Sequence, residues 1–146
     1  MHSSILYVSR SLVSASEARE QWAAIQAVSV ARNSLLDLTG LLIVTPDYFT
    51  QFLEGEAAPL DCVMASIRAD ARHADIFETQ TAPMFDSIQF PAWRMACFSP
   101  SSFVSRHLVP ILERHHREIS LADASDLIAF MRNIGPDFPT LPTFQD

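Results

Sequence analysis

Glycine and cysteine are scarce in this chain of 146 residues, and their scarcity argues against two kinds of site. Only Gly40, Gly55 and Gly135 occur, so the glycine-rich phosphate loop of a small phosphatase-like hydrolase is missing. The two cysteines, Cys62 and Cys97, lack the spacing of a metal or redox site, and small buried thiols are common in protein cores. We therefore expect neither phosphate-loop chemistry nor a bound metal.

Basic residues are also few. Ten Lys and Arg stand against 17 Asp and Glu, which gives a net charge of −7 and a pI near 5.1. Proteins that bind phosphate backbones usually carry a clustered basic surface, so we expect no direct binding of nucleic acid. No apolar run approaches the ~18 residues that cross a bilayer, and the N-terminus lacks the basic start and long apolar stretch of a signal peptide. The expected location is cytoplasmic, without membrane contact.

Apolar residues are plentiful, at 49% of the chain with ten Phe, which indicates a globular fold. A chain of this length fits one domain, because a domain of about 150 residues buries roughly 70% of its unfolded surface. We expect a single compact unit with no room for a second, catalytic domain.

The residue pattern predicts alternating strands and helices. Residues 4–10 alternate as a strand does, and Ser14 and Glu17 match a capping box that opens a helix reaching about Asn33. One side of that helix carries a stripe of Trp22, Ile25, Val28, Ser29, Arg32 and Asn33. A hairpin is predicted next, from residues 38–45 and 48–54, and its turn is Pro46-Asp47.

Further elements complete the order βαββαββ. A second helix opens near Pro59 with an inward stripe, and strands follow around 77–83 and 93–98. Two helices on one face of a five-stranded sheet make a ferredoxin-like α+β sandwich. Two amphipathic stripes in the tail predict helices that cap the other face; their residues are Leu108, Ile111, Leu112, His115 and Ile119, then Leu127, Met131 and Ile134.

Polar residues stand where strand alternation predicts apolar ones. Tyr7 shares a face with Ile5 on the first strand, and Gln51 shares a face with Leu53 on the third. Each alone is consistent with a satisfied core residue. Together with Asn33 they predict a polar cluster in an apolar cleft, paired internally or to a ligand, because an unpaired buried amide costs about 1–3 kcal/mol.

Five short motifs, in order over roughly residues 4–98, resemble the BLUF family of flavin-based blue-light sensors. They are Leu6-Tyr7; Arg32-Asn33 followed by Leu38-Thr39-Gly40-Leu41-Leu42; Phe49-Thr50-Gln51-Phe52-Leu53-Glu54-Gly55; Asp70-Ala71-Arg72-His73; and Phe90-Pro91-Ala92-Trp93-Arg94-Met95. The resemblance implies a non-covalent flavin, usually FAD, with FMN or riboflavin as alternatives, lying between the two helices.

The resemblance also implies which residues hold the flavin. Ile25 and Ile67 would sandwich the ring faces, where apolar burial favours a large aromatic ligand. Asn33 would bond the N3/O4 edge, Arg72 the C2 carbonyl side, and His73 would lie near the ribityl or phosphate portion. A solvated helix end is the alternative for Arg72 and His73.

The mechanism implied by the resemblance is a hydrogen-bond switch. Neutral Tyr7 gives an electron and a proton toward the excited flavin, and Gln51 relays the proton and returns rotated or as a tautomer, two outcomes that remain open. Trp93 and Met95, two apart on the last strand, both face the flavin or both leave it, and they pass the signal on. Ordinary core packing is the alternative for this pair. Ser29 is expected as a secondary contact to the Trp, Gln or Met group.

The expected organisation is a flavin-binding domain over 1–98, capping helices over 99–135 in the same compact unit, and a Pro-rich tail over 136–146. Such a chain would be a photosensor and not an enzyme, acting on a separate downstream protein or through homo-oligomers. Two other functions are weighed: a small hydrolase on the same scaffold, and a colourless interaction module without flavin. The presence of Tyr7, Asn33 and Gln51 argues against the module.

Overall fold

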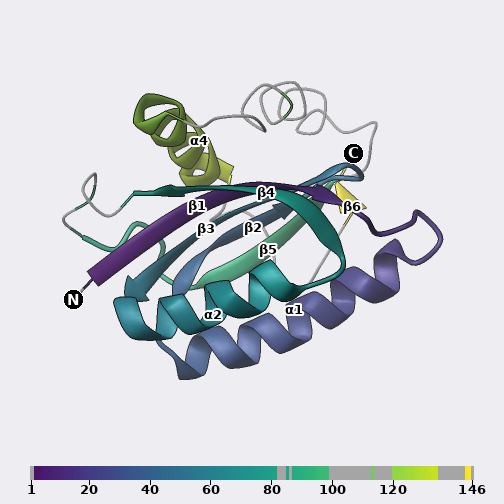
Figure 1. Cartoon of the computed structure of the whole chain (residues 1–146), viewed down its shortest axis with the longest axis horizontal. Coiled ribbons are helices and arrows are strands. Elements are labelled where there is room, and N and C mark those ends of the chain that lie inside the picture. Colours follow the sequence, from purple (N-terminus) through teal and green to yellow (C-terminus); the bar gives the residue numbers. More distant parts are fainter. Residues whose placement is uncertain are drawn as a thin grey trace.

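The computed structural model describes residues 2–81, 85, 87–98, 113, 120–134 and 144–145. Its elements follow the order strand, helix, hairpin, helix, strand, strand, helix (Figure 1). They are β1 (His2–Ser11), α1 (Ala18–Leu35), β2 (Thr39–Val44), β3 (Tyr48–Glu56), α2 (Ala57–Ala69), β4 (His73–Gln80), β5 (Trp93–Phe98), α4 (Leu121–Ile134) and β6 (Phe144–Gln145).

The strands form one mixed sheet in the order β4-β1-β3-β2-β5-β6. β1 lies between β3 and β4 and pairs antiparallel with both, whereas β2 pairs antiparallel with β3 and parallel with β5. The helices α1 and α2 cross one face, and α4 lies on the other (Figure 1). The predicted ferredoxin-like sandwich is confirmed for β1 to β5, and the two-residue β6 extends the sheet beside β5.

Each face of the sheet has its own apolar core. The core under α1 and α2 includes Tyr7, Trp22 and Met95, and the core under α4 includes Phe52, Phe90 and Met131. Because β2 contributes Leu42 to one core and Leu41 to the other, it reads as an unbroken apolar run. The predicted cover on both faces is confirmed.

Gly40 allows the close approach of β3 to β2. Its φ is +149°, and a Cβ there would lie 1.9 Å from the Phe52 carbonyl oxygen. Its N–H donates to the Ala92 carbonyl at 3.2 Å, just before β5 begins. A side chain at this position would therefore disturb β2, β3 and the start of β5 together.

Two local predictions fail, the helix cap described here and the bounds of one strand. The Ser14–Glu17 capping box does not form: α1 begins at Ala18, Glu17 makes no side-chain cap, and the Ser14 hydroxyl lies 3.2 Å from that of Ser16. On α1 the buried residues are Trp22, Gln26, Ser29 and Asn33, whereas Val28 is 62% exposed.

The strand predicted around 77–83 begins earlier, at His73, and ends at Gln80. Of the tail stripes, Leu127 and Met131 are buried against the sheet as predicted. Leu108, Ile111, Leu112, His115 and Ile119 lie outside the described residues, as does the side chain of Ile134. Among the described helices, none is both long and apolar enough to cross a membrane.

Candidate functional site

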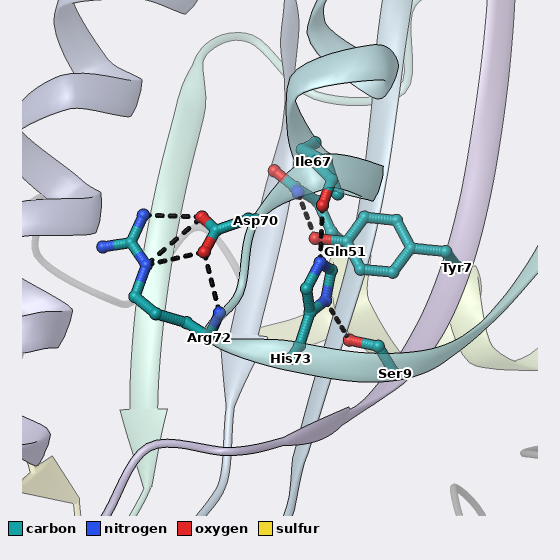
Figure 2. A network of polar contacts seen from close by, with 7 residues as sticks. All are labelled: Tyr7, Ser9, Gln51, Ile67, Asp70, Arg72 and His73. Atoms are coloured by element: carbon teal, nitrogen blue, oxygen red, sulfur yellow. Dashed lines mark hydrogen bonds and ion pairs between the residues drawn. The ribbon is translucent and has the colours of Figure 1, made fainter.

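Tyr7 and Gln51 are brought together by strand register. They lie directly opposite each other on β1 and β3, and both side chains point toward the helices. Gln51 Nε2 donates a 2.8 Å hydrogen bond to Tyr7 Oη (Figure 2). The other end of the same amide, Oε1, accepts a 2.8 Å hydrogen bond from Trp93 Nε1. The sequence predicted these residues singly; the sheet joins them into one chain of bonds.

This chain of bonds is shielded from water. Tyr7 is 3% exposed, Gln51 4% and Trp93 7%. Burial raises the pKa of the Tyr7 phenol well above its ordinary value, although the hydrogen bond from Gln51 opposes the change. The phenol is therefore neutral across the physiological pH range and keeps its proton at Oη.

A cleft of about 250 Å³ opens above these residues, between α1 and α2. Its volume is close to the lower end of the roughly 300–1,000 Å³ typical of small-molecule sites, so it suits the flat ring system of a ligand. The lining residues come from both helices, four strands and the turn after α2: Tyr7, Ile25, Val28, Ser29, Arg32, Leu42, Phe49, Gln51, Ser66, Ile67, Asp70, Arg72 and His73.

One end of the cleft is polar because of the turn after α2. The Arg72 guanidinium donates from Nε and Nη2 to the Asp70 carboxylate, at 2.9 and 2.6 Å, and the Arg72 backbone N–H also donates to it (Figure 2). These bonds lower the pKa of Asp70 and raise that of Arg72. The pair fixes the Arg72 fork at the cleft edge in a single orientation.

His73 lies at the edge of the cleft and bonds two elements of the fold. Its Nε2 lies 2.6 Å from the Ile67 carbonyl oxygen, so Nε2 carries a proton and donates, while Nδ1 lies 2.7 Å from Ser9 Oγ (Figure 2). Its ring also meets the rings of Tyr7 and Phe49 edge-on, at about 6 Å. Both ring nitrogens are thus occupied in joining the end of α2 to β1, and contact with a ribityl or phosphate group stays a prediction.

Asn33 is fully buried and holds an unpaired donor. Its Oδ1 accepts a long bond, 3.4 Å, from Arg32 Nε, but Nδ2 has no hydrogen-bond partner among the described residues. An amide donor left unpaired in the interior costs free energy, which favours a missing acceptor near this position. Arg32 lines the cleft, and partial burial lowers its pKa.

The remaining predicted residues divide between the cleft and the core. Ile25 and Ile67 line the cleft from opposite helices, and Ser29 lines it beside Ile25. Met95 is fully buried in the core under α1 and α2, on the same side of β5 as Trp93. Both therefore face the helices, which answers the question of register, while a contact from Ser29 to this group remains a prediction.

Sequence reasoning gave no role to several residues of the cleft. Phe49 and Leu42 alternate with buried partners on their strands and looked like ordinary core. Asp70 was noted only within a motif, although a carboxylate two residues before Arg72 is a recognisable signal for a fixed guanidinium. Val28, on the predicted stripe of α1, is 62% exposed and lines the cleft.

This chain is similar to known proteins in sequence and in fold. A family model described as "BLUF: Sensors of blue-light using FAD" matches residues 3–96. The photoactivated adenylate cyclase subunit alpha of Euglena gracilis is 33% identical over 66 residues, which cover 45% of this chain and 6% of that protein.

Two solved structures share the fold. BlrB, a BLUF protein in its dark state, is 25% identical with a TM-score of 0.64, and the match covers 90% of this chain and 96% of BlrB. A bacterial light-regulated adenylyl cyclase is 26% identical with the same TM-score, and the match covers 79% of this chain but 35% of the cyclase. This chain therefore spans a small part of the two cyclases and nearly the whole of BlrB.

Proposed function

This chain belongs to the BLUF family, and we propose that it is a blue-light photoreceptor that binds one flavin non-covalently in the cleft between α1 and α2. One observation carries the proposal: Tyr7 and Gln51 line that cleft, and their buried hydrogen bond continues through the Gln51 amide to Trp93 in the core. Such a series of hydrogen bonds can adopt more than one arrangement of donors and acceptors. A change in the ligand can therefore change the arrangement.

The residues present fit a flavin. Ile25 and Ile67 offer apolar faces on the two sides of the cleft, and burial of ring surface at about 25 cal/mol per Å² would stabilise a flat aromatic ligand there. The unpaired Nδ2 of Asn33 fits the need of a flavin edge for a donor. Arg72, held at the cleft edge by Asp70, would supply a second donor to a carbonyl oxygen.

When bound, the flavin would supply absorption of blue light and, once excited, an acceptor for an electron and a proton. The protein contributes a neutral Tyr7, whose proton is held at Oη by burial. Gln51 Nε2 donates to Oη at 2.8 Å, so the phenol proton could pass to this amide only through its acceptor end, Oε1. The apolar walls exclude water, which would otherwise offer competing proton partners.

The orientation of the Gln51 amide links Tyr7 to Trp93. In the structure Nε2 donates to the phenol and Oε1 accepts from the indole. If the amide turned by 180°, Tyr7 could still pair, because a hydroxyl can donate as well as accept, but Nε2 would then face the N–H of Trp93. Two donors cannot share a hydrogen bond. A rotated amide would therefore displace Trp93, whereas a tautomer could bring about the same change without rotation.

The output would reach another molecule through changed contacts. Trp93 is the first residue of β5, and β5 lies between β2 and the edge strand β6. Movement of Trp93 would therefore shift β5 relative to both neighbouring strands. We propose a photosensor and not an enzyme, acting on a separate protein partner or through self-association. FAD is the proposed flavin, with FMN or riboflavin as alternatives, and the unit of function would be residues 1–98 with capping helices over 99–135.

The test is the absorption spectrum of the purified chain before and after blue light. We expect a flavin band that shifts slightly to the red and recovers in darkness, and a shift that is lost in Tyr7→Phe and in Gln51→Leu while flavin is retained. A chain that binds no flavin on reconstitution with FAD would overturn the proposal and favour an interaction module. A flavin whose absorbance bleaches would overturn the switch while keeping the cofactor.

A further inference from the structure

Glu54 is a fully buried carboxylate on the face of the sheet opposite the cleft. Along β3, Gln51 and Leu53 point toward α1 and α2, whereas Phe52 belongs to the core under α4. Strand alternation places Glu54 on the side of Phe52. A buried carboxylate is costly unless several donors satisfy it, so its surroundings indicate what holds it there.

Two consecutive backbone N–H groups converge on this carboxylate. The Gln89 N–H donates to both oxygens, at 2.9 and 2.8 Å, and the Phe90 N–H donates to Oε2 at 2.8 Å. The hydroxyl of Thr39 adds a weaker bond at 3.3 Å, and His2 Nε2 lies 3.5 Å from Oε1. Hydrogen bonds to an ionised acceptor are stronger than neutral ones, so Glu54 holds the 89–90 backbone firmly against β3.

The segment held by Glu54 leads directly into β5. Pro91 and Ala92 follow Phe90, Pro91 restricts the backbone, and the Ala92 carbonyl accepts the N–H of Gly40. Trp93 comes next, paired with Gly40 at the start of the parallel ladder. The start of β5 is thus held from β3 by Glu54 and from β2 by Gly40.

Glu54 and Gln51 hold the two ends of one short segment. Gln51 bonds the Trp93 indole on the helix side of the sheet, and Glu54, three residues along the same strand, bonds the backbone of Gln89 and Phe90 on the other side. Freedom at positions 89–90 would move the backbone of Trp93 and lengthen its bond to Gln51.

We propose that Glu54 is a positioning residue for Trp93: its carboxylate sets where β5 begins and so keeps the indole N–H on the Gln51 amide. The proposal rests on the proposed function for its meaning, since only a photoreceptor uses the Gln51–Trp93 bond as a switch. Its structural part can be tested in darkness without a photocycle, so the two can fail separately.

The experiment follows the indole N–H resonance of Trp93 by nitrogen-edited NMR of the full chain in the dark. The chain has two Trp, and Trp22→Phe assigns the remaining indole signal. Glu54→Gln keeps the shape and one acceptor oxygen, and Glu54→Leu removes both acceptors. Thr39→Val is the matched control, because it removes only the 3.3 Å bond to the same carboxylate. Circular dichroism establishes that each variant is folded.

We expect the Trp93 signal to move toward that of free indole in Glu54→Gln and further in Glu54→Leu, with proton exchange at least about tenfold faster in the latter. Thr39→Val should leave the signal in place. An unchanged Trp93 signal in folded Glu54→Leu would overturn the proposal, and if that variant does not fold, an unchanged signal in Glu54→Gln would do so. A lower stability with the indole signal unmoved would mean that Glu54 serves the fold alone.

Discussion

The bond between Tyr7 and Gln51 should be measurable as a coupling free energy. Tyr7→Phe removes the acceptor of Gln51 Nε2, and Gln51→Leu removes the partner of both Tyr7 Oη and Trp93 Nε1. These atoms belong to side chains less than 8% exposed, so each single variant leaves a buried polar group unpaired, at a cost of about 1–3 kcal/mol. The double variant removes both partners of the same bond and avoids part of that cost.

We therefore expect the double variant to lose about 1 kcal/mol less than the sum of the two single losses. The assay is urea unfolding followed by far-ultraviolet circular dichroism for the parent, the two single variants and the double variant. Flavin-free protein is used, because a bound ligand adds its own stabilisation.

A matched pair supplies the control. Tyr7→Phe combined with Ser4→Ala changes one residue on each face of the sheet, since the Ser4 hydroxyl pairs with Thr81 away from the cleft. Distant changes should add within about 0.3–0.5 kcal/mol. If Tyr7→Phe and Gln51→Leu add as closely as this pair does, the two side chains do not share the bond and the switch loses its physical basis.

Four further outcomes follow from the structure. Because Val28 is 62% exposed yet lines the cleft, Val28→Asp should weaken flavin binding several-fold in a fluorescence titration without lowering the unfolding midpoint in flavin-free protein. Asp70→Asn should lower flavin affinity in the same titration, since the Arg72 guanidinium loses the carboxylate that orients it. If Asp70→Asn and the parent bound flavin equally well, an oriented Arg72 would not contribute to flavin binding. Burial raises the pKa of Tyr7 above 10.0, so the unfolded chain loses its phenolic proton first as pH rises; the unfolding free energy should fall above about pH 10, and less steeply in Tyr7→Phe. Met131→Ala should cost about 2–4 kcal/mol in urea unfolding, because Met131 is fully buried under α4; a loss below about 1 kcal/mol would mean that α4 is not docked.

Most of the fold could be predicted because its signals are local. Alternation identified β1 and β3, the apolar run of residues 38–45 identified a strand covered on both faces, and Pro46-Asp47 marked the hairpin turn. Chain order then left few ways to arrange two helices and these strands. The start of α1 was missed because Ser14 pairs with Ser16, an option that a cap motif in the sequence does not reveal.

Part of the candidate site could be predicted, because polar residues stand at positions where the strand and helix patterns predict apolar ones. A Tyr and a Gln on core-facing strand positions, with Asn33 beside an apolar stripe, indicate a polar cluster from the sequence alone. The protein partners of His73 could not be predicted. Its ring nitrogens bond Ser9 and the Ile67 carbonyl, and neither partner is close to it in sequence.

The sequence by itself determined which side chains are neutral, polar and apolar, and through periodicity which of them share a face. Tertiary structure alone decided how they pair. The register of β1 on β3 sets Tyr7 opposite Gln51, and the parallel pairing of β5 with β2 brings Trp93 to the other end of the same amide. The same holds for Glu54, whose bonds reach across 35 and 36 positions to the Gln89 and Phe90 backbone. Periodicity acts over one turn or one pleat, whereas these contacts depend on where distant segments meet once both faces of the sheet are covered.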